Sequence, residues 1–146
     1  MKLQDFDARI WSKANKQYYS PQISFLHISD ESNSTLERIP AMSFINKKGE
    51  YLDRINLSLN DLELELYTGL KDCEGVEIYE GDILAHFNHA NGIEYYSKVT
   101  WNQRNARFEL IIIEHPADPL PIGDVVGYIQ IVGNIHENKD LLEEAK

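Results

Sequence analysis

The stretch YTGLKDCEGVEIYEGDIL, which begins at residue 67, holds the densest set of side chains that could do chemistry. It brings several carboxylates and the one cysteine of the chain close together. Paired carboxylates can act as general acid and base, and several together can bind a hard cation such as Ca²⁺. The stretch is therefore either a catalytic or metal-binding loop or the corner of a fold. Its carboxylates are Asp72, Glu74, Glu77, Glu80 and Asp82.

The spacing of these acids does not fit a known calcium loop. An EF-hand needs a glycine at the sixth loop position, but Gly75 is the fourth residue when Asp72 is taken as the first. Glycosidase chemistry needs one carboxyl group in an apolar pocket, and a dense acidic run gives no sign of one. The spacing therefore favours a solvated turn, without catalytic or metal-binding residues.

Cysteine and histidine supply no better site. Cys73 lies between Asp72 and Glu74, whose negative charges disfavour the thiolate that a nucleophile needs. His86 and His89 are spaced for one helix face, but HFNH reads as a strand end entering a turn, where the two side chains point apart. Nucleophile-elbow, zinc-protease, Walker and dinucleotide motifs are absent from the sequence, so we expect no catalytic residue, metal or cofactor. The remaining histidines, in separate segments, are His27, His115 and His136.

The segment SKVTWNQRNARF combines cations with aromatic residues. Lys98, Arg104 and Arg107 could contact phosphates while Trp101 or Tyr96 stacks on a base. Aromatic residues are also favoured at protein interfaces, and on strands one member of an adjacent pair is usually core. A β-hairpin with a solvated turn is the simpler interpretation. The aromatic residues concerned are Tyr18, Tyr19, Tyr95, Tyr96 and Trp101.

The net charge weighs against general nucleic-acid binding. The chain carries a formal charge of -10, and residues 67–146 hold 6 Lys and Arg against 14 Asp and Glu. Binding to phosphates depends on cations that release counterions, so an acidic chain favours other partners. Nucleic acid stays the alternative partner, through the local basic segment.

Length and composition predict an ordinary soluble domain. A chain of 146 residues buries about 70% of its unfolded surface, which is enough for a hydrophobic core. A single cysteine excludes an internal disulfide. The start MKLQDFDARIW has no apolar signal-peptide core, and no membrane-length apolar run follows. We therefore expect a cytoplasmic protein without a membrane partner.

In the first half of the chain, apolar and polar residues alternate as they do in β-strands. In LQDFDARIW apolar residues alternate with charged ones, and QYYSPQISFLHIS continues this pattern, with Pro21 at a bulge or an edge. Residues 29–36 are polar and predict a loop. The segment RIPAMSFINKKGEYLDRINLSLN predicts two strands joined by a turn at NKKGE. In DLELELYTG, a strand would place Leu64 and its apolar neighbours on one face and Glu65 with the other acids opposite.

The second half predicts a meander of short antiparallel strands. DILAHF and IEYYSKVTW are joined by NHANG, and WNQRNARFELIII repeats the hairpin pattern. After the proline-rich EHPADPLPIGD, the segment VVGYIQIVGNI forms one more strand. NKDLLEEAK then predicts a short C-terminal helix with Asn138 or Asp140 as its N-cap.

The predicted fold is mainly β. Five short strands between about residue 78 and residue 136 suit an SH3-like small barrel. We predict an N-terminal mainly-β subdomain over residues 1–68 and the barrel with its terminal helix over residues 69–146. Gly69, Gly75 and Gly81 would provide backbone angles that a side chain resists.

Three segments give the chain a resemblance to a known family. FDARIWSKANKQY, LYTGLKDCEGVEIYEGDIL and IVGNIHENKDLL resemble the YopX family, which is encoded by phages and prophages of Gram-positive bacteria. The resemblance implies a C-terminal SH3-like barrel and no established activity, and it supplies no catalytic residues. Cys73 departs from the family, which more often has a polar residue there. The signature residues that we expect to be structural are Gly69, Gly75, Tyr79, Gly81 and Asp82.

Two functions remain open. The first is a non-enzymatic phage accessory protein that binds a host or phage protein, or itself, through exposed β edges and aromatic residues. The second is nucleic-acid binding through the barrel. An enzyme is a weaker third option, because no motif supports one.

Overall fold

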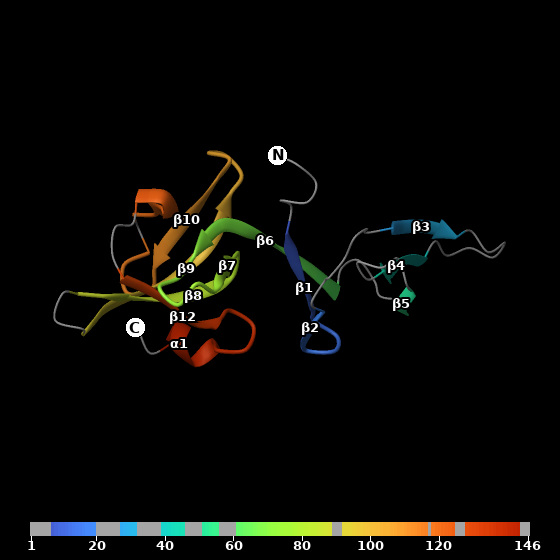
Figure 1. Ribbon diagram of the computed structural model, residues 1–146, viewed down its shortest axis with the longest axis horizontal. Helices are drawn as coiled ribbons and strands as arrows, with labels where there is room; N and C mark the ends of the chain where they lie inside the picture. Colours follow the sequence, from blue (N-terminus) through green and yellow to red (C-terminus); the bar gives the residue numbers. More distant parts are fainter. Residues whose placement is uncertain are drawn as a thin grey trace. The chain divides into compact units, whose positions relative to one another are not determined.

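The chain forms two compact units. The structure is a computed structural model (Figure 1), and the two units lie within Asp7–Glu65 and Leu66–Lys146. The predicted domain boundary, between residues 68 and 69, falls inside strand β6 (Leu62–Lys71) and stays a prediction. The residues that the structure describes are 7–19, 27–31, 39–45, 51–55, 61–88, 92–116, 118–124 and 128–143.

A small hairpin begins the first unit. Strands β1 (Ala8–Ser12) and β2 (Gln17–Tyr19) pair antiparallel, and in the sheet order β1 lies between β2 and β6. The Ser12 hydroxyl accepts a hydrogen bond from the Asn15 N–H at 3.1 Å, which holds the turn between the strands. Alternation in the LQDFDARIW segment therefore correctly predicts a strand, with Ala8 and Ile10 buried.

Strand β6 has its acidic face inward at Glu65. Glu65 is 3% exposed, and its carboxylate accepts hydrogen bonds from Arg9 Nε at 2.6 Å and from the Tyr18 hydroxyl at 3.2 Å. Leu64, on the opposite face, is 49% exposed. The prediction of a strand with its leucines and its acids on opposite faces is confirmed, and at this point the acidic face is the buried one. An ion pair with hydrogen bonds makes the buried carboxylate tolerable.

A separate three-stranded sheet contains β3 (His27–Glu31), β4 (Ile39–Ile45) and β5 (Tyr51–Ile55). All neighbours in this sheet are antiparallel, which confirms the two predicted strands β4 and β5. The predicted loop over residues 29–36 is wrong for its first three residues, because Ser29 pairs with Ala41 and Glu31 with Ile39. Backbone pairing outweighs the weak strand propensity of this polar segment. Pro21 and the NKKGE turn lie outside the described residues.

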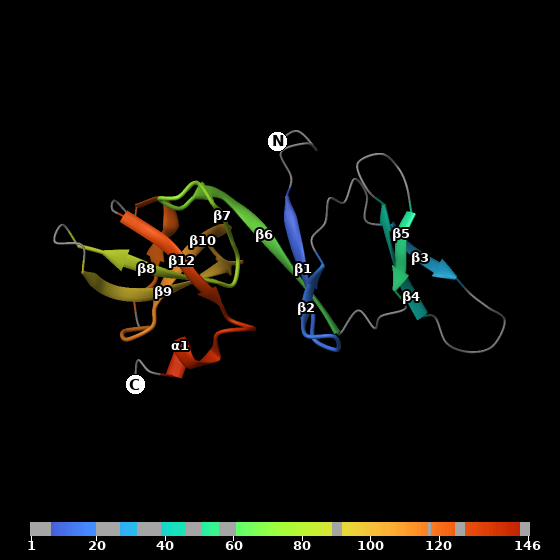
Figure 2. The same ribbon diagram turned by 60° about the horizontal axis from the view of Figure 1, so that its bottom comes forward.

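The second unit is organised around a five-stranded antiparallel sheet, ordered β11-β10-β9-β8-β12 (Figures 1 and 2). Figure 2 shows the long, strongly curved β9 beside β8. The predicted meander and the last strand are confirmed. The sheet strands are β8 (Asp82–Phe87), β9 (Ile93–Asn102), β10 (Arg107–Ile112), β11 (Leu120–Pro121) and β12 (Tyr128–Asn134). The other elements are β7 (Glu77–Tyr79), which pairs with β6, a 3-10 helix η3 (Ile122–Asp124) and helix α1 (Lys139–Glu143).

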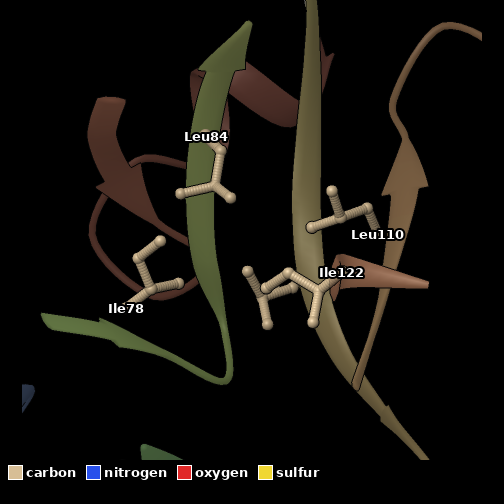
Figure 3. Close-up of a cluster of buried hydrophobic side chains, with 5 residues drawn as sticks. Ile78, Leu84, Leu110 and Ile122 are labelled. Atoms are coloured by element: carbon tan, nitrogen blue, oxygen red, sulfur yellow. The ribbon is translucent and has the colours of Figure 1, made fainter. Parts of the chain in front are cut away.

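The core of this unit joins β7 to the sheet. Buried aliphatic side chains of β7, β8, β9, β10 and η3 form this core, and Figure 3 shows them lying together. Each such side chain stabilises the fold by about 1.5–3 kcal/mol when it is fully buried. The cluster consists of Ile78, Leu84, Val99, Leu110 and Ile122, with Phe108, Ile129 and Ile131 packed against it.

The structure contains the predicted short terminal helix. Helix α1 covers Lys139–Glu143, so Asn138 occupies the N-cap position and Asp140 does not. The Asn138 side chain accepts a hydrogen bond from the Asn134 N–H at 3.1 Å and so joins the helix start to the end of β12. No helix in the described ranges is long and apolar enough to cross a membrane.

Three glycines of the family signature have positive φ angles. Gly69, Gly75 and Gly81 have φ between 83° and 85°, the left-handed conformation that the sequence predicts for them. Gly81 is also buried, and it donates to the Val99 carbonyl at 3.0 Å and accepts from the Ile135 N–H at 2.9 Å. This glycine therefore connects the turn before β8 to β9 and to the segment after β12.

We expect Gly81→Val to destabilise the protein by ~2 kcal/mol or more, because a β-branched residue resists φ near +83°. Urea unfolding followed by circular dichroism measures this change. Glu74→Gln, on an exposed side chain, is the control and should change stability by less than about 0.5 kcal/mol. Equal stability of Gly81→Val and the wild type would contradict the role given to this glycine.

Candidate functional site

A groove lies beside the β9–β10 hairpin, in the segment that combines cations with aromatic residues. It has a volume of about 650 Å³. By strand alternation Thr100 and Asn102 share one face of β9, and on β10 Glu109 lies opposite Thr100, with Ile111 two residues further along the same face. The lining residues are Thr100, Trp101, Asn102, Gln103, Arg104, Glu109, Ile111 and Pro119.

The hairpin turn is held by a polar network. The Asn102 side-chain oxygen accepts hydrogen bonds from the backbone N–H groups of Arg104 at 3.0 Å and Asn105 at 3.1 Å. The Asn102 amide nitrogen donates to Glu109 at 2.7 Å. Ala106 completes the turn with φ of 49°. The wall of the groove is therefore fixed before any ligand arrives.

Glu109 is the buried carboxylate of this groove. It is 3% exposed, and its other oxygen accepts from Asn105 Nδ2 at 3.1 Å and Arg107 Nε at 2.8 Å. The hydrogen bonds from Asn102, then Arg107 and Asn105, lower the pKa of Glu109 despite its burial. The carboxylate is therefore charged at neutral pH and already paired.

The predicted cations differ in their environment. Arg107 is held by Glu109, so its charge is largely balanced within the hairpin. Arg104 is exposed and lines the groove, and Lys98 lies opposite Ile111 across the β9–β10 ladder. The structure thus brings the three predicted cations to one hairpin, with Arg107 already engaged in an ion pair.

The predicted aromatic residues divide between core and surface. Trp101 is 39% exposed, and its ring packs edge-on against Phe108 with the centroids 5.0 Å apart. Tyr95 and Tyr96 are half-buried. In the first unit Tyr18 packs edge-on against Trp11, whereas the Tyr19 side chain lies outside the described part. Among the aromatic residues singled out from the sequence, Trp101 is therefore the most exposed one whose side chain the structure describes.

The acids of the family signature are not all solvated. Asp72 is 8% and Asp82 1% exposed, so the prediction of a solvated turn is wrong for these two residues. Asp82 accepts a hydrogen bond from the Tyr79 N–H at 2.8 Å, and so closes the turn before β8. Burying a carboxylate costs free energy, and here hydrogen bonds from backbone N–H groups offset that cost. The described residues contain no group of three or more His, Cys, Asp or Glu side chains that could hold a metal ion.

Asp72 organises the turn between β6 and β7. Its carboxylate accepts from the N–H groups of Glu74 and Val76 at 2.9 Å and from Ile131 at 3.2 Å. Burial raises the pKa of Asp72, but hydrogen bonds from backbone N–H groups outweigh this effect and the pKa lies below its ordinary value. Cys73, in the same turn, is free and exposed.

Sequence reasoning missed a buried polar cluster around His86. His86 Nε2 lies 2.7 Å from the Ser97 hydroxyl, and its ring stacks on Tyr95 with the centroids 4.2 Å apart. Glu114 interacts electrostatically with His86, and one buried oxygen of Glu114 has no hydrogen-bond partner. Strand pairing puts Ser97 beside this histidine, and no local motif in the sequence signals it.

The His86–Ser97 pair is closed to substrate. Ser97 is 0% and His86 4% exposed, so a nucleophilic serine is not available at the surface. Burial lowers the pKa of His86 to about 4, although the charge of Glu114 acts in the opposite direction. His86 is therefore neutral at pH 7. His89 and the side chain of His27 lie outside the described residues, and His115 and His136 are in other segments.

Comparisons with known proteins identify a family and a fold. The family model described as YopX protein matches residues 8–143. The crystal structure of protein EF1440 from Enterococcus faecalis is similar, with a TM-score of 0.57 and 22% sequence identity. The similarity covers 94% of this chain and 98% of that chain. No curated protein matches the chain.

We expect His86 to make stability depend on pH. The pKa of His86 is 6.5 when exposed and about 4 when folded, so the unfolded state binds the proton first as the pH falls. Stability should be independent of this group above pH 6.5 and decrease between pH 6.5 and pH 4, by ~3 kcal/mol in total. Urea unfolding at a series of pH values measures the slope.

In His86→Gln, the free energy of unfolding should depend less on pH in the upper part of this range, whatever the effect of the substitution on absolute stability. The exposed residue His115 provides the control, and His115→Gln should keep the wild-type slope. An unchanged slope in His86→Gln would show that other groups bind the proton.

Proposed function

The chain belongs to the YopX family, and we propose that it is a phage- or prophage-encoded accessory protein that works by binding another protein in the bacterial cytoplasm. The observation that carries this proposal is the groove beside the β9–β10 hairpin, which is lined by a partly exposed tryptophan of β9 and by an exposed arginine of the hairpin turn. No catalytic role is assigned to any residue. The partner at this groove is a host or phage protein.

We also infer that residues 69–146 form a small SH3-like barrel. Five antiparallel strands in one sheet, with β7 and η3 contributing to the same core, support this inference. In folds of this kind, a rigid scaffold of strands holds the loops and hairpins that contact ligands. A binding surface on the β9–β10 hairpin agrees with this arrangement.

The residues of the groove are suited to protein recognition. Trp and Arg are the types that most often dominate the energy of an interface, and both Trp101 and Arg104 line the groove. Ile111 and Pro119 add apolar surface. Because Asn102 and Glu109 already fix the turn, a partner would lose little free energy in ordering it.

Binding of nucleic acid is less well supported. A phosphate-binding hairpin needs free cations, but Arg107 donates to the buried Glu109. The surrounding sequence is acidic, which opposes the approach of a polyanion. Only Lys98 and Arg104 of the three predicted cations then remain for phosphate contacts.

We expect a random peptide library displayed on phage to yield peptides that bind the wild-type protein and bind Arg104→Ala at least about tenfold more weakly, since loss of one interface arginine costs ~1–2 kcal/mol. Calorimetric titration with the selected peptides measures the affinities. Lys139→Ala, an exposed change outside the groove, should bind as the wild type does. Selected peptides that bind all three proteins equally would contradict a role for the groove.

We expect a fluorescein-labelled single-stranded oligonucleotide to show no anisotropy change with the wild-type protein at low salt. At low salt, screening is weakest and any phosphate contact is strongest. A saturable increase that falls steeply with salt and is lost in Arg104→Ala would favour nucleic acid as the ligand.

A further inference from the structure

The outer edge of β12 is covered by the turn between β6 and β7, residues 72–76, which we call the edge turn. In the five-stranded sheet, β12 is an end strand and pairs with β8 alone. On its other side the Cys73 N–H donates to the Ile129 carbonyl at 2.9 Å, and the Ile131 N–H donates to Asp72 at 3.2 Å. An added strand would need the Ile129 carbonyl and the Ile131 N–H for its hydrogen bonds, and the edge turn already occupies both.

Asp72 both folds the edge turn and attaches it to β12. One carboxylate oxygen accepts from the N–H groups of Glu74 and Val76, while the other accepts from Ile131. The Asp72 backbone N–H also donates to the Val76 carbonyl at 2.8 Å. Because these bonds come from a single buried side chain, loss of the carboxylate would release the turn and the edge together.

The edge that this turn covers is suited to strand addition. Residues 128–132 read YIQIV, which contains β-branched and aromatic residues, no charge and no proline. Tyr128 is 69% and Val132 37% exposed, so the segment is also accessible from one face. Uncharged segments of this kind on a sheet edge are the usual sites of edge-to-edge association, and natural proteins cover or charge them.

We propose that the edge turn keeps β12 closed against strand addition by a second copy of the chain. An antiparallel pair of two β12 strands would bring no like charges together over YIQIV, and β-branched and aromatic residues would lie opposite one another. The whole chain carries a formal charge of -10, which opposes contact between two copies through charged parts of the surface. A second copy is therefore the occupant that the uncovered edge would fit best, and this surface is independent of the β9–β10 groove.

Three variants of the full chain test the proposal. Asp72→Ala removes the carboxylate. Cys73→Pro removes the N–H that reaches Ile129, and proline is tolerated at the second position of a turn whose Gly75 N–H bonds to the Asp72 carbonyl. Glu74→Ala is the control in the same turn, because its exposed side chain makes no contact with β12 that the structure describes. The molar mass is measured by light scattering after size exclusion over a range of concentrations, with near-ultraviolet circular dichroism to verify the fold.

We expect folded Asp72→Ala and Cys73→Pro to show a concentration-dependent doubling of the molar mass, relative to the wild type and Glu74→Ala. Hydrogen exchange at the Ile131 N–H should be faster in Asp72→Ala at low concentration and slower again when the larger species forms. Folded variants that keep the wild-type mass at every concentration would overturn the proposal. If both variants unfold, the turn is needed for folding and the proposal of an edge guard is also wrong.

Discussion

The hydrogen bonds of the Asp72 carboxylate are the interaction on which the second unit most depends. A sheet of five strands has two open edges, and β12 is the longer of the two end strands. At that edge the Asp72 carboxylate accepts the Ile131 N–H, which points away from β8. The same carboxylate folds the turn that joins β6 to β7, and β7 brings Ile78 into the core. Edge, turn and core are therefore coupled through one residue.

Buried carboxylates recur as structural elements throughout the described chain. Glu65 pairs with Arg9, Asp82 closes the turn before β8, and Glu109 fixes the β9–β10 hairpin. Each accepts hydrogen bonds from groups that fold with it, which offsets the cost of burial. Because their oxygens already have partners, these acids are poorly suited to bind a cation or to transfer a proton. The acidic composition thus reflects, in part, how the fold is held together.

Local periodicity predicts the strands of this protein well, and positive φ explains its signature glycines. The face of β6 could not be predicted, because Glu65 is buried by Arg9 and Tyr18, which approach from another segment. The burial of Asp72 depends on Ile131, and the His86–Ser97 pair depends on strand register. These features arise from contacts between residues far apart in the chain, which one sequence does not reveal. The groove residues were partly predictable, since the hairpin itself places Trp101 and Arg104 together.

The segment with the most ionisable residues and the hairpin proposed above as the binding surface are different parts of the second unit. In the family signature, the glycines with positive φ and the buried acids stabilise the fold. A substitution there would therefore lower stability, whatever its effect on binding. The β9–β10 hairpin has its polar groups satisfied within the turn, yet leaves Trp101 partly exposed and Arg104 at the surface. Residues that the fold does not need to bury can vary with the partner, so the proposed function predicts that differences in specificity lie in this hairpin.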